Sequence, residues 1–306
     1  MTAAADAPRA PARAPAASLF LVVVVGIVWG CNWPVLKLGV TELAPLTFRG
    51  ASLGFAGLAL LAVARASGDH LRIPRQWLGR TVVLAMFNIA AWNALILFGV
   101  QRLPAGRSAI LAYTMPLWSV LFARIALDER LSGRKALGLA LGMLGMGVLV
   151  SEDLRNFARA PTGALLVVGA AMTWSVGTVL LRKWRPPIPQ SVLTGWMLII
   201  GWVPIAALAL AVDPHAISSI VNASPRGHFA IAYNIFFAGT LAHWAWFRMA
   251  RTLPVAVSSL SSLPVPVVGV VSGMLFLGER PGTLEFVALA LVLASLAAVL
   301  LPERRR

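Results

Sequence analysis

The sequence is poor in charge, and above all in acidic charge. Only 12% of its 306 residues are charged, with 11 Asp and Glu against 26 Lys and Arg, and 59% are hydrophobic. The mean hydropathy is +0.82. A soluble chain of this composition could not cover its surface with polar groups, so a membrane is the expected solvent. This excludes an ordinary water-soluble domain.

Groups that catalyse reactions or bind metals are also scarce. The chain has one cysteine, Cys31, which excludes an intramolecular disulfide, and only four histidines. It lacks HExxH, a Cys/His cluster, a glycine-rich phosphate loop and a pair of aspartates inside apolar stretches. An intramembrane serine protease would need a nucleophile in a tight turn, and GVVSG around Ser272 has the wrong spacing. We therefore expect no enzyme, no metal site and no cofactor.

Long hydrophilic segments are missing as well, because apolar stretches follow one another with short connections. A helix needs roughly 20 apolar residues to cross a bilayer. The runs are continuous rather than alternating, which excludes a β-barrel. The sequence predicts an all-α membrane protein with ten transmembrane helices, at 17–37, 44–64, 81–101, 104–123, 136–151, 162–181, 191–212, 228–247, 254–277 and 283–301.

The two ends of the chain are predicted to be tails. Residues 1–16, MTAAADAPRAPARAPA, are rich in Ala and Pro and are typical of a disordered segment, and residues 302–306 form a short basic tail. A secretory signal is the competing interpretation of the first apolar run. That run continues into WGCNWPVLKLG without a small-residue cleavage site, which favours a retained span.

The net charge of +15 could indicate a nucleic-acid partner, but its distribution indicates membrane topology instead. Most Lys and Arg fall in loops that share the side of the amino terminus, and few fall on the opposite side. Because this bias sets orientation, both termini are predicted to be cytoplasmic. We expect a small-molecule substrate, surrounding lipid, no nucleic acid and a monomer.

Two stretches repeat one another at a distance of about half the chain. LPAGRSAILAYTMP begins at Leu103 and LPVAVSSLSSLPVP at Leu253, and the register continues through Pro116 and Pro266 to the DER and GER that follow. Trp29 and Trp174 open a second, less regular match. Each half then holds five spans, an odd number, so the second half enters the membrane from the opposite side. This predicts an inverted repeat of residues 17–151 and 162–301, an architecture common in transporters. Chance recurrence of Pro and Ser is the alternative.

These features resemble a known family. The first span WGCNWPVLKLG, the segment LPAGRSA, the DER and GER after spans four and nine, and the 5+5 layout are similar to the drug/metabolite transporter superfamily. Within it, the chain resembles the EamA-type branch, and more specifically the YddG-like amino-acid exporters, over residues 17–301. The resemblance implies a bacterial inner-membrane exporter. It also implies a central cavity between the halves, lined mainly by spans one, three, four, six, eight and nine.

Polar and aromatic residues inside spans point to the same cavity, since such residues normally face a bundle interior or a wet space. Several recur at helical spacing and therefore share a face. The predicted substrate-binding residues are Trp29, Asn32, Trp33, Asn88, Trp92, Asn93, Tyr113, Trp174, Thr178, His243, Trp244 and Ser258. Simpler roles stay open: Trp33 as an interfacial anchor, Asn32 and Asn88 as bridges between helices, and His243 as a structural hydrogen-bonding group. Spans two, five and seven show no comparable face, although Arg49 lies inside span two.

The matched prolines predict a pair of hinges. A proline within a span removes a backbone hydrogen bond and kinks the helix. Pro116 and Pro266 occupy equivalent positions in the two halves, so two symmetric kinks could open one side while closing the other. Small residues nearby, which let helices pack closely, are the alternative explanation.

An aromatic, weakly charged cavity suits solutes with an apolar side chain and a small polar end. Amino acids, above all aromatic and other neutral ones, meet this description, and so do hydrophobic cations that stack on tryptophan. We favour a uniporter that exports amino acids by alternating access. The alternative is proton-coupled export of hydrophobic or cationic drugs, with His243 carrying the proton. A passive channel would show charge rings or a repeated filter, which the sequence does not contain.

Overall fold

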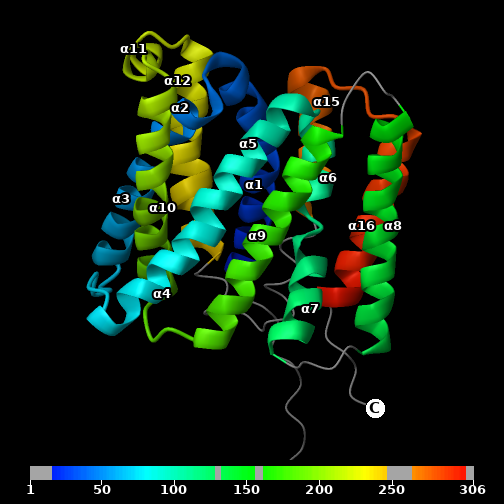
Figure 1. The fold of residues 1–306 in the computed structure, drawn as a ribbon, viewed down its shortest axis with the longest axis horizontal. Helices are drawn as coiled ribbons and strands as arrows, with labels where there is room; N and C mark the ends of the chain where they lie inside the picture. The colour runs from blue at the N-terminus through cyan, green and yellow to red at the C-terminus, as the bar shows by residue number, and fades with distance from the viewer. Residues whose placement is uncertain (1–15, 128–131, 156–160, 247–263, 301–306) are drawn as a thin grey trace, which may run out of the picture.

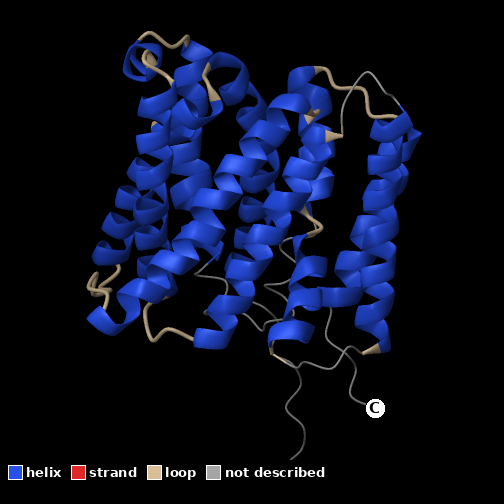
Figure 2. Cartoon of the chain, viewed as in Figure 1, coloured by secondary structure: helices blue, strands red, loops and turns tan. Residues whose placement is uncertain are grey.

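The computed structural model describes residues 16–127, 132–155, 161–246 and 264–300. Within these ranges every regular element is a helix (Figure 2), as the composition predicts. The elements are α1 (Ala16–Glu42), α2 (Pro45–Gly50), α3 (Leu53–Ala66), α4 (Arg75–Ala85), η1 (Met86–Ala91), α5 (Trp92–Arg102), α6 (Ala105–Ala112), α7 (Met115–Ala126), α8 (Gly133–Arg155), α9 (Thr162–Trp184), α10 (Gln190–Val212), α11 (Ala216–Val221), α12 (Pro225–Ala232), η2 (Tyr233–Leu241), α15 (Pro264–Leu277) and α16 (Thr283–Leu300).

Six segments of the described chain are long and apolar enough to cross a membrane: Phe20–Glu42, Pro45–Ala66, Arg75–Arg102, Ala105–Ala126, Thr162–Trp184 and Gln190–Val212. Two shorter apolar helices follow, in α15 and α16. The protein is therefore a helical membrane protein. The other four predicted spans, including the one that begins at residue 254, stay predictions.

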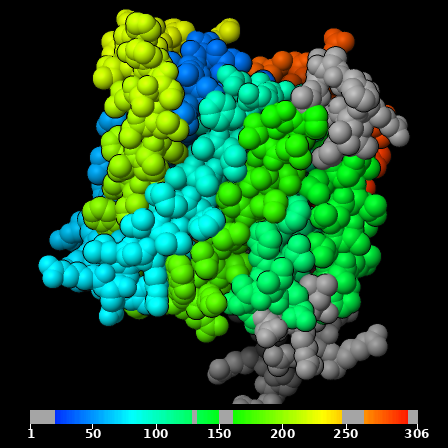
Figure 3. All heavy atoms as spheres, viewed as in Figure 1, coloured from blue at the N-terminus to red at the C-terminus, as the bar shows by residue number. Residues whose placement is uncertain are grey.

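The helices pack in pairs that join distant parts of the sequence (Figure 1). α8 lies beside α16 at one edge of the molecule, and α3 lies beside α10 at the other. Between them α1 packs on α15, and α9 packs on α5, α6 and α7. The segment α4–η1–α5 crosses this face diagonally, and its side chains meet those of α9 in the space-filling view (Figure 3).

Large apolar side chains lie both inside and outside this bundle. Phe48 and Leu97 are completely buried, whereas Phe55 and Phe276 on the outside are 58% and 69% exposed. Exposed apolar surface of this extent would be unfavourable in water and is what lipid-facing helices present. The outer surface thus agrees with a membrane as solvent.

Within the described residues, four of the predicted spans are interrupted rather than regular. Span two breaks between α2 and α3 at Ala51–Ser52, and span four breaks between α6 and α7 at Tyr113–Thr114. Spans three and eight contain the π-helical turns η1 and η2. Such interruptions leave backbone groups for other partners and occur often at functional sites.

The prediction of a kink at Pro116 needs correction in one respect. The helix stops before this proline, and Pro116 lies in the first turn of α7, where its missing N–H costs no hydrogen bond. Pro266 is the third described residue of α15. Residues 247–263 lie outside the described chain, so a matching break there stays a prediction.

Candidate functional site

A cavity lies at the centre of the bundle, where the interrupted spans meet. It encloses ≈ 940 Å³ of space free of atoms, including its open mouth. Its lining is mostly apolar with a few polar groups: Trp29, Asn32, Trp33, Leu36, Arg49, Ser52, Leu53, Ala56, Ile89, Trp92, Asn93, Ile96, Tyr113, Met115, Trp174, Leu198, Asn234, Ala238, Gly239 and His243.

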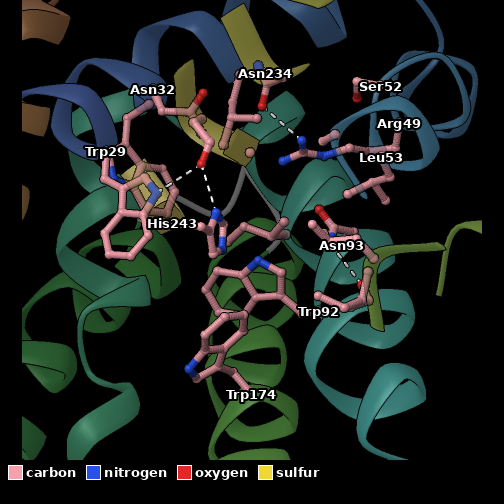
Figure 4. Close-up of a pocket in the computed structure, with 18 of the residues that line it drawn as sticks. Trp29, Asn32, Arg49, Ser52, Leu53, Trp92, Asn93, Trp174, Asn234 and His243 are labelled. Atoms are coloured by element: carbon pink, nitrogen blue, oxygen red, sulfur yellow. Dashed lines mark hydrogen bonds between the residues drawn. The ribbon is translucent and has the colours of Figure 1, made fainter. Parts of the chain in front are cut away.

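Two tryptophans form one end of the cavity (Figure 4). Trp92 opens α5 directly after the π turn, and Trp174 lies in the middle of α9. Their rings meet edge to face, with centroids 5.2 Å apart and planes at 60°. Such a pair offers a preformed aromatic surface on which a flat or branched apolar group can pack.

The π turn η2 brings a second set of groups into the cavity. The Ala238 carbonyl accepts the Trp29 indole N–H at 3.2 Å and lies 3.0 Å from His243 Nδ1 (Figure 4). Trp29 and His243 also make an edge-to-face contact at 5.3 Å. A carbonyl that serves two side chains fixes both rings against the wall formed by α1 and η2.

The π turn also changes which residues share a face. Asn234 and His243 both line the cavity, although they are nine positions apart. In an α-helix nine residues make about two and a half turns, which would put them on opposite faces. The wider π turn brings them to the same side, and Trp244 leaves the lining as a result. Trp244 instead packs with Val25 and Ala245.

The amide side chains have different roles. Asn32 lines the cavity, and its Oδ1 is buried with no hydrogen-bond partner. Asn93 lines it too, with Nδ2 donating to the Ile89 carbonyl at 2.8 Å. Asn88 does not reach the lining: its Nδ2 donates to the Trp174 carbonyl at 3.0 Å, as a bridge between helices. The simpler role considered for Asn88 describes its geometry.

Most of the residues predicted from the sequence lie together. Those on the lining are Trp29, Asn32, Trp33, Trp92, Asn93, Tyr113, Trp174 and His243. Three others are absent from it: Asn88, Trp244 and Thr178, whose hydroxyl donates to the Trp174 carbonyl of its own helix at 2.9 Å. Ser258 lies outside the described residues.

Span two was wrongly left out of the predicted lining. Arg49, Ser52, Leu53 and Ala56 all face the cavity, and Leu198 adds span seven. Arg49 lies in the last turn of α2, and its Nη1 donates to Asn234 Oδ1 at 2.8 Å. The signal was present in the sequence, because a charged residue inside a span is normally functional. Helical periodicity does not reveal it, because span two carries no face of polar and aromatic residues.

The sequence profile of the EamA-like transporter family matches the chain twice, over residues 16–151 and 161–301. The chain belongs to this family. It is 28% identical to a protein of Escherichia coli K12 named as a probable amino-acid metabolite efflux pump, over 90% of this chain and 92% of the relative. It is 23% identical to the uncharacterized transporter YoaV of Bacillus subtilis, over 85% and 88%. It is 26% identical to the uncharacterized inner membrane transporter YedA of E. coli K12, over 91% and 90%.

A solved crystal structure has the same fold, with a TM-score of 0.65 and 20% identity, covering 92% of this chain and 96% of the other. The family match confirms the resemblance seen in the sequence. Family membership and the efflux-pump relatives indicate a transporter rather than an enzyme. The cavity is therefore the candidate substrate site of an EamA-family transporter.

Proposed function

We propose that this protein exports amino acids, chiefly aromatic and other neutral ones, by alternating access. The observation that carries the proposal is the Trp92–Trp174 pair at one end of a largely apolar cavity that also holds amide groups. A neutral amino acid has a matching pair of ends, one apolar and one polar. The efflux-pump relatives support the same substrate class.

The proposed architecture is ten spans in two inverted repeats, residues 17–151 and 162–301. The double family match supports it. The packing supports it as well. Span one (α1) packs on span nine (α15) as span four (α6 and α7) packs on span six (α9). The second spans of the two halves (α3 and α10) pack on each other, and so do their fifth spans (α8 and α16). The π turns η1 and η2 add support, since each carries an Asn-Ile pair, at Asn88 and at Asn234.

We propose that the protein resides in the bacterial inner membrane as a monomer with both termini cytoplasmic. The multiple apolar helices and the inner-membrane relative YedA support the membrane, and the excess of basic residues on one side supports the orientation. After replacement of Cys31 by Ala, single cysteines at Arg75 and Arg304 should resist an impermeant thiol reagent applied to intact cells. A cysteine at Arg226 should react. Labelling of the cysteines at Arg75 and Arg304 would show that the termini face the outside instead.

A second function is favoured by one observation, the presence of His243 on the lining. Export of hydrophobic cations in exchange for protons would use this imidazole as the proton carrier. Transport of cations would then depend on a pH gradient.

Counterflow in proteoliposomes tests the proposed function. Vesicles are loaded with unlabelled tryptophan, leucine or a quaternary ammonium drug, and entry of the labelled form is followed. We expect saturable exchange of tryptophan and leucine that protein-free vesicles lack. Exchange of the drug alone, with no amino-acid signal, would replace the proposed substrate class by the second one.

A further inference from the structure

We propose that Arg49 binds the carboxylate of the transported solute and that Asn32 accepts its ammonium group, so that the cavity selects zwitterionic amino acids and rejects amines. This inference rests on the proposed function and specifies its substrate class. It depends on three features of the cavity: an unbalanced buried cation, an unpaired acceptor, and their arrangement relative to the tryptophan pair.

The first feature is the burial of Arg49 without a counterion. Arg49 is only 8% exposed, and no carboxylate of the described chain forms an ion pair with its guanidinium. Its Nη1 donates a hydrogen bond to Asn234 Oδ1, while its Nε is buried with no hydrogen-bond partner. Arginine keeps its charge when buried, and an unbalanced charge away from water is costly.

A purely structural role explains this position poorly. A link between α2 and η2 would need one neutral hydrogen bond, which an amide or hydroxyl could supply without burying a charge. Buried polar residues inside membrane spans normally mark a substrate or ion pathway. An anionic ligand would balance the charge and could take two parallel hydrogen bonds from the planar guanidinium.

The second feature is the unpaired acceptor of Asn32. Its Oδ1 is buried and has no hydrogen-bond donor within the described protein. A buried acceptor without a donor is unfavourable, so a group that donates to it on binding gains free energy. An ammonium group is such a donor, and the faces of the surrounding indoles also attract cations.

The third feature is the arrangement of these groups (Figure 4). Asn32 and Arg49 enter the cavity from different sides, the Arg49 guanidinium extends inward to Asn234, and the Trp92–Trp174 pair lies below them in this view. A solute with its carboxylate toward Arg49 and its ammonium toward Asn32 directs its side chain to the tryptophans. An amine without a carboxylate would meet the positive charge of Arg49 in a region of low dielectric, where repulsion is strong.

Competition in the counterflow assay tests this on the wild-type protein. Entry of labelled tryptophan is measured against tryptophan, its methyl ester, tryptamine and indole-3-propionate. The ester and tryptamine lack the free carboxylate, and we expect each to inhibit at a concentration about tenfold higher than tryptophan, or more. Indole-3-propionate, which lacks only the ammonium group, should lie between. Equal inhibition by tryptamine and tryptophan overturns the proposal while leaving amino-acid transport intact.

Variants separate binding from a structural role. Arg49→Gln should abolish the preference for tryptophan over tryptamine, and Arg49→Lys should retain part of it because the charge remains. Arg226→Gln, an exposed arginine on α12, is the matched control and should behave as wild type. If Arg49→Gln lowers thermal stability but keeps the wild-type preference, Arg49 only ties helices together and the proposal is wrong.

A binding measurement covers the case in which the wild type moves no amino acid. The detergent-purified protein is heated with each of the four compounds, and the shift in melting temperature is recorded. Larger shifts with tryptophan and indole-3-propionate than with tryptamine support the carboxylate site even if the proposed transport function fails. Larger shifts with tryptamine overturn it.

Discussion

The Glu279 carboxylate binds the first turn of α6. Its two oxygens accept the backbone N–H groups of Ala105 at 2.5 Å and of Gly106 at 3.0 Å. A carboxylate at this position accepts hydrogen bonds from the free amides of the first turn and interacts favourably with the helix dipole. Lys37 holds the preceding helix end, because its Nζ donates to the carbonyls of Val100, Gln101 and Leu103 at 2.8 to 2.9 Å. The α5–α6 turn is thus fastened from both sides, by residues of α1 and of the turn after α15.

Loss of the Glu279 carboxylate is expected to loosen this end of the transporter. Glu279→Gln should lower the apparent melting temperature by about 2–4 °C, the effect of losing a helix cap of roughly 1 kcal/mol. Gly273→Ala should act similarly, since an added Cβ would lie 2.5 Å from Glu279 Oε2. Arg280→Gln, exposed and adjacent, is the control.

Accessibility of the cavity provides the second measurement for this cap. In a Cys31→Ala background, a cysteine at Ser52, which lines the cavity, is labelled with an impermeant maleimide from the side of the α5–α6 turn. Labelling should be faster in both Glu279→Gln and Gly273→Ala than in their parent. Unchanged labelling and melting temperature in the two variants would show that the contact does not stabilise the α5–α6 turn.

The fold class could be predicted from the sequence because it depends on composition. Continuous apolar runs with few charges leave helices as the available structure in lipid, and the described chain is helical throughout its regular elements. The breaks were harder to foresee. Gly50 and Ser52, which flank Ala51, are residue types common at helix ends, but small residues are also common inside apolar spans, and π turns such as η1 have no simple composition. They depend on packing with neighbouring helices, which a periodicity argument does not contain.

The candidate site was predictable where a polar group and an aromatic ring share a regular helical face. Trp29 and Asn32 are three positions apart in α1, and both line the cavity. Helical periodicity does not predict the lining after η2, because the π turn shifts the phase of the helix, and Trp244 is absent from the lining. Periodicity also does not single out Arg49, because the lining residues next to it in span two, Ser52, Leu53 and Ala56, include no aromatic ring. Single charges inside spans carry as much information as periodic patterns.

The tryptophan pair is expected to set substrate affinity. Replacing Trp92 or Trp174 by Ala removes an aromatic surface, and KM for tryptophan counterflow should rise by about tenfold while the amount of inserted protein is retained. Trp184→Ala is the control, because Trp184 packs at the end of α9 under the Arg80 guanidinium, 5.7 Å from its ring centroid. A similar rise in KM in this control would indicate a general folding effect.

Pro116 is expected to affect turnover more than binding. Replacing it by Ala would allow α6 and α7 to join across Tyr113–Thr114, since alanine restores the amide that proline lacks. A continuous helix should favour one facing state, so that the maximal rate falls several-fold while KM changes little. Pro266→Ala should do the same if the hinges are matched.

The control for this prediction is Pro204→Ala, because Pro204 is an exposed proline inside α10 and does not line the cavity. It should transport at the wild-type rate. A double variant of Pro116 and Pro266 with wild-type turnover would leave these prolines a packing role only.

The last prediction concerns the energy source. Coupled carriers commonly hold a carboxylate at membrane depth, whose charge is neutralised as the site moves. No Asp or Glu is among the described residues that line the cavity, and the imidazole there, His243, is held by the Ala238 carbonyl. We therefore expect tryptophan counterflow in the absence of any pH or sodium gradient, and no accumulation above equilibrium when a pH gradient is imposed. Both are measured in the same vesicles, with a proton ionophore added to one half. Uphill accumulation that the ionophore stops and that His243→Ala abolishes would identify the histidine as a proton-coupling residue. The transporter would then be an antiporter rather than a uniporter.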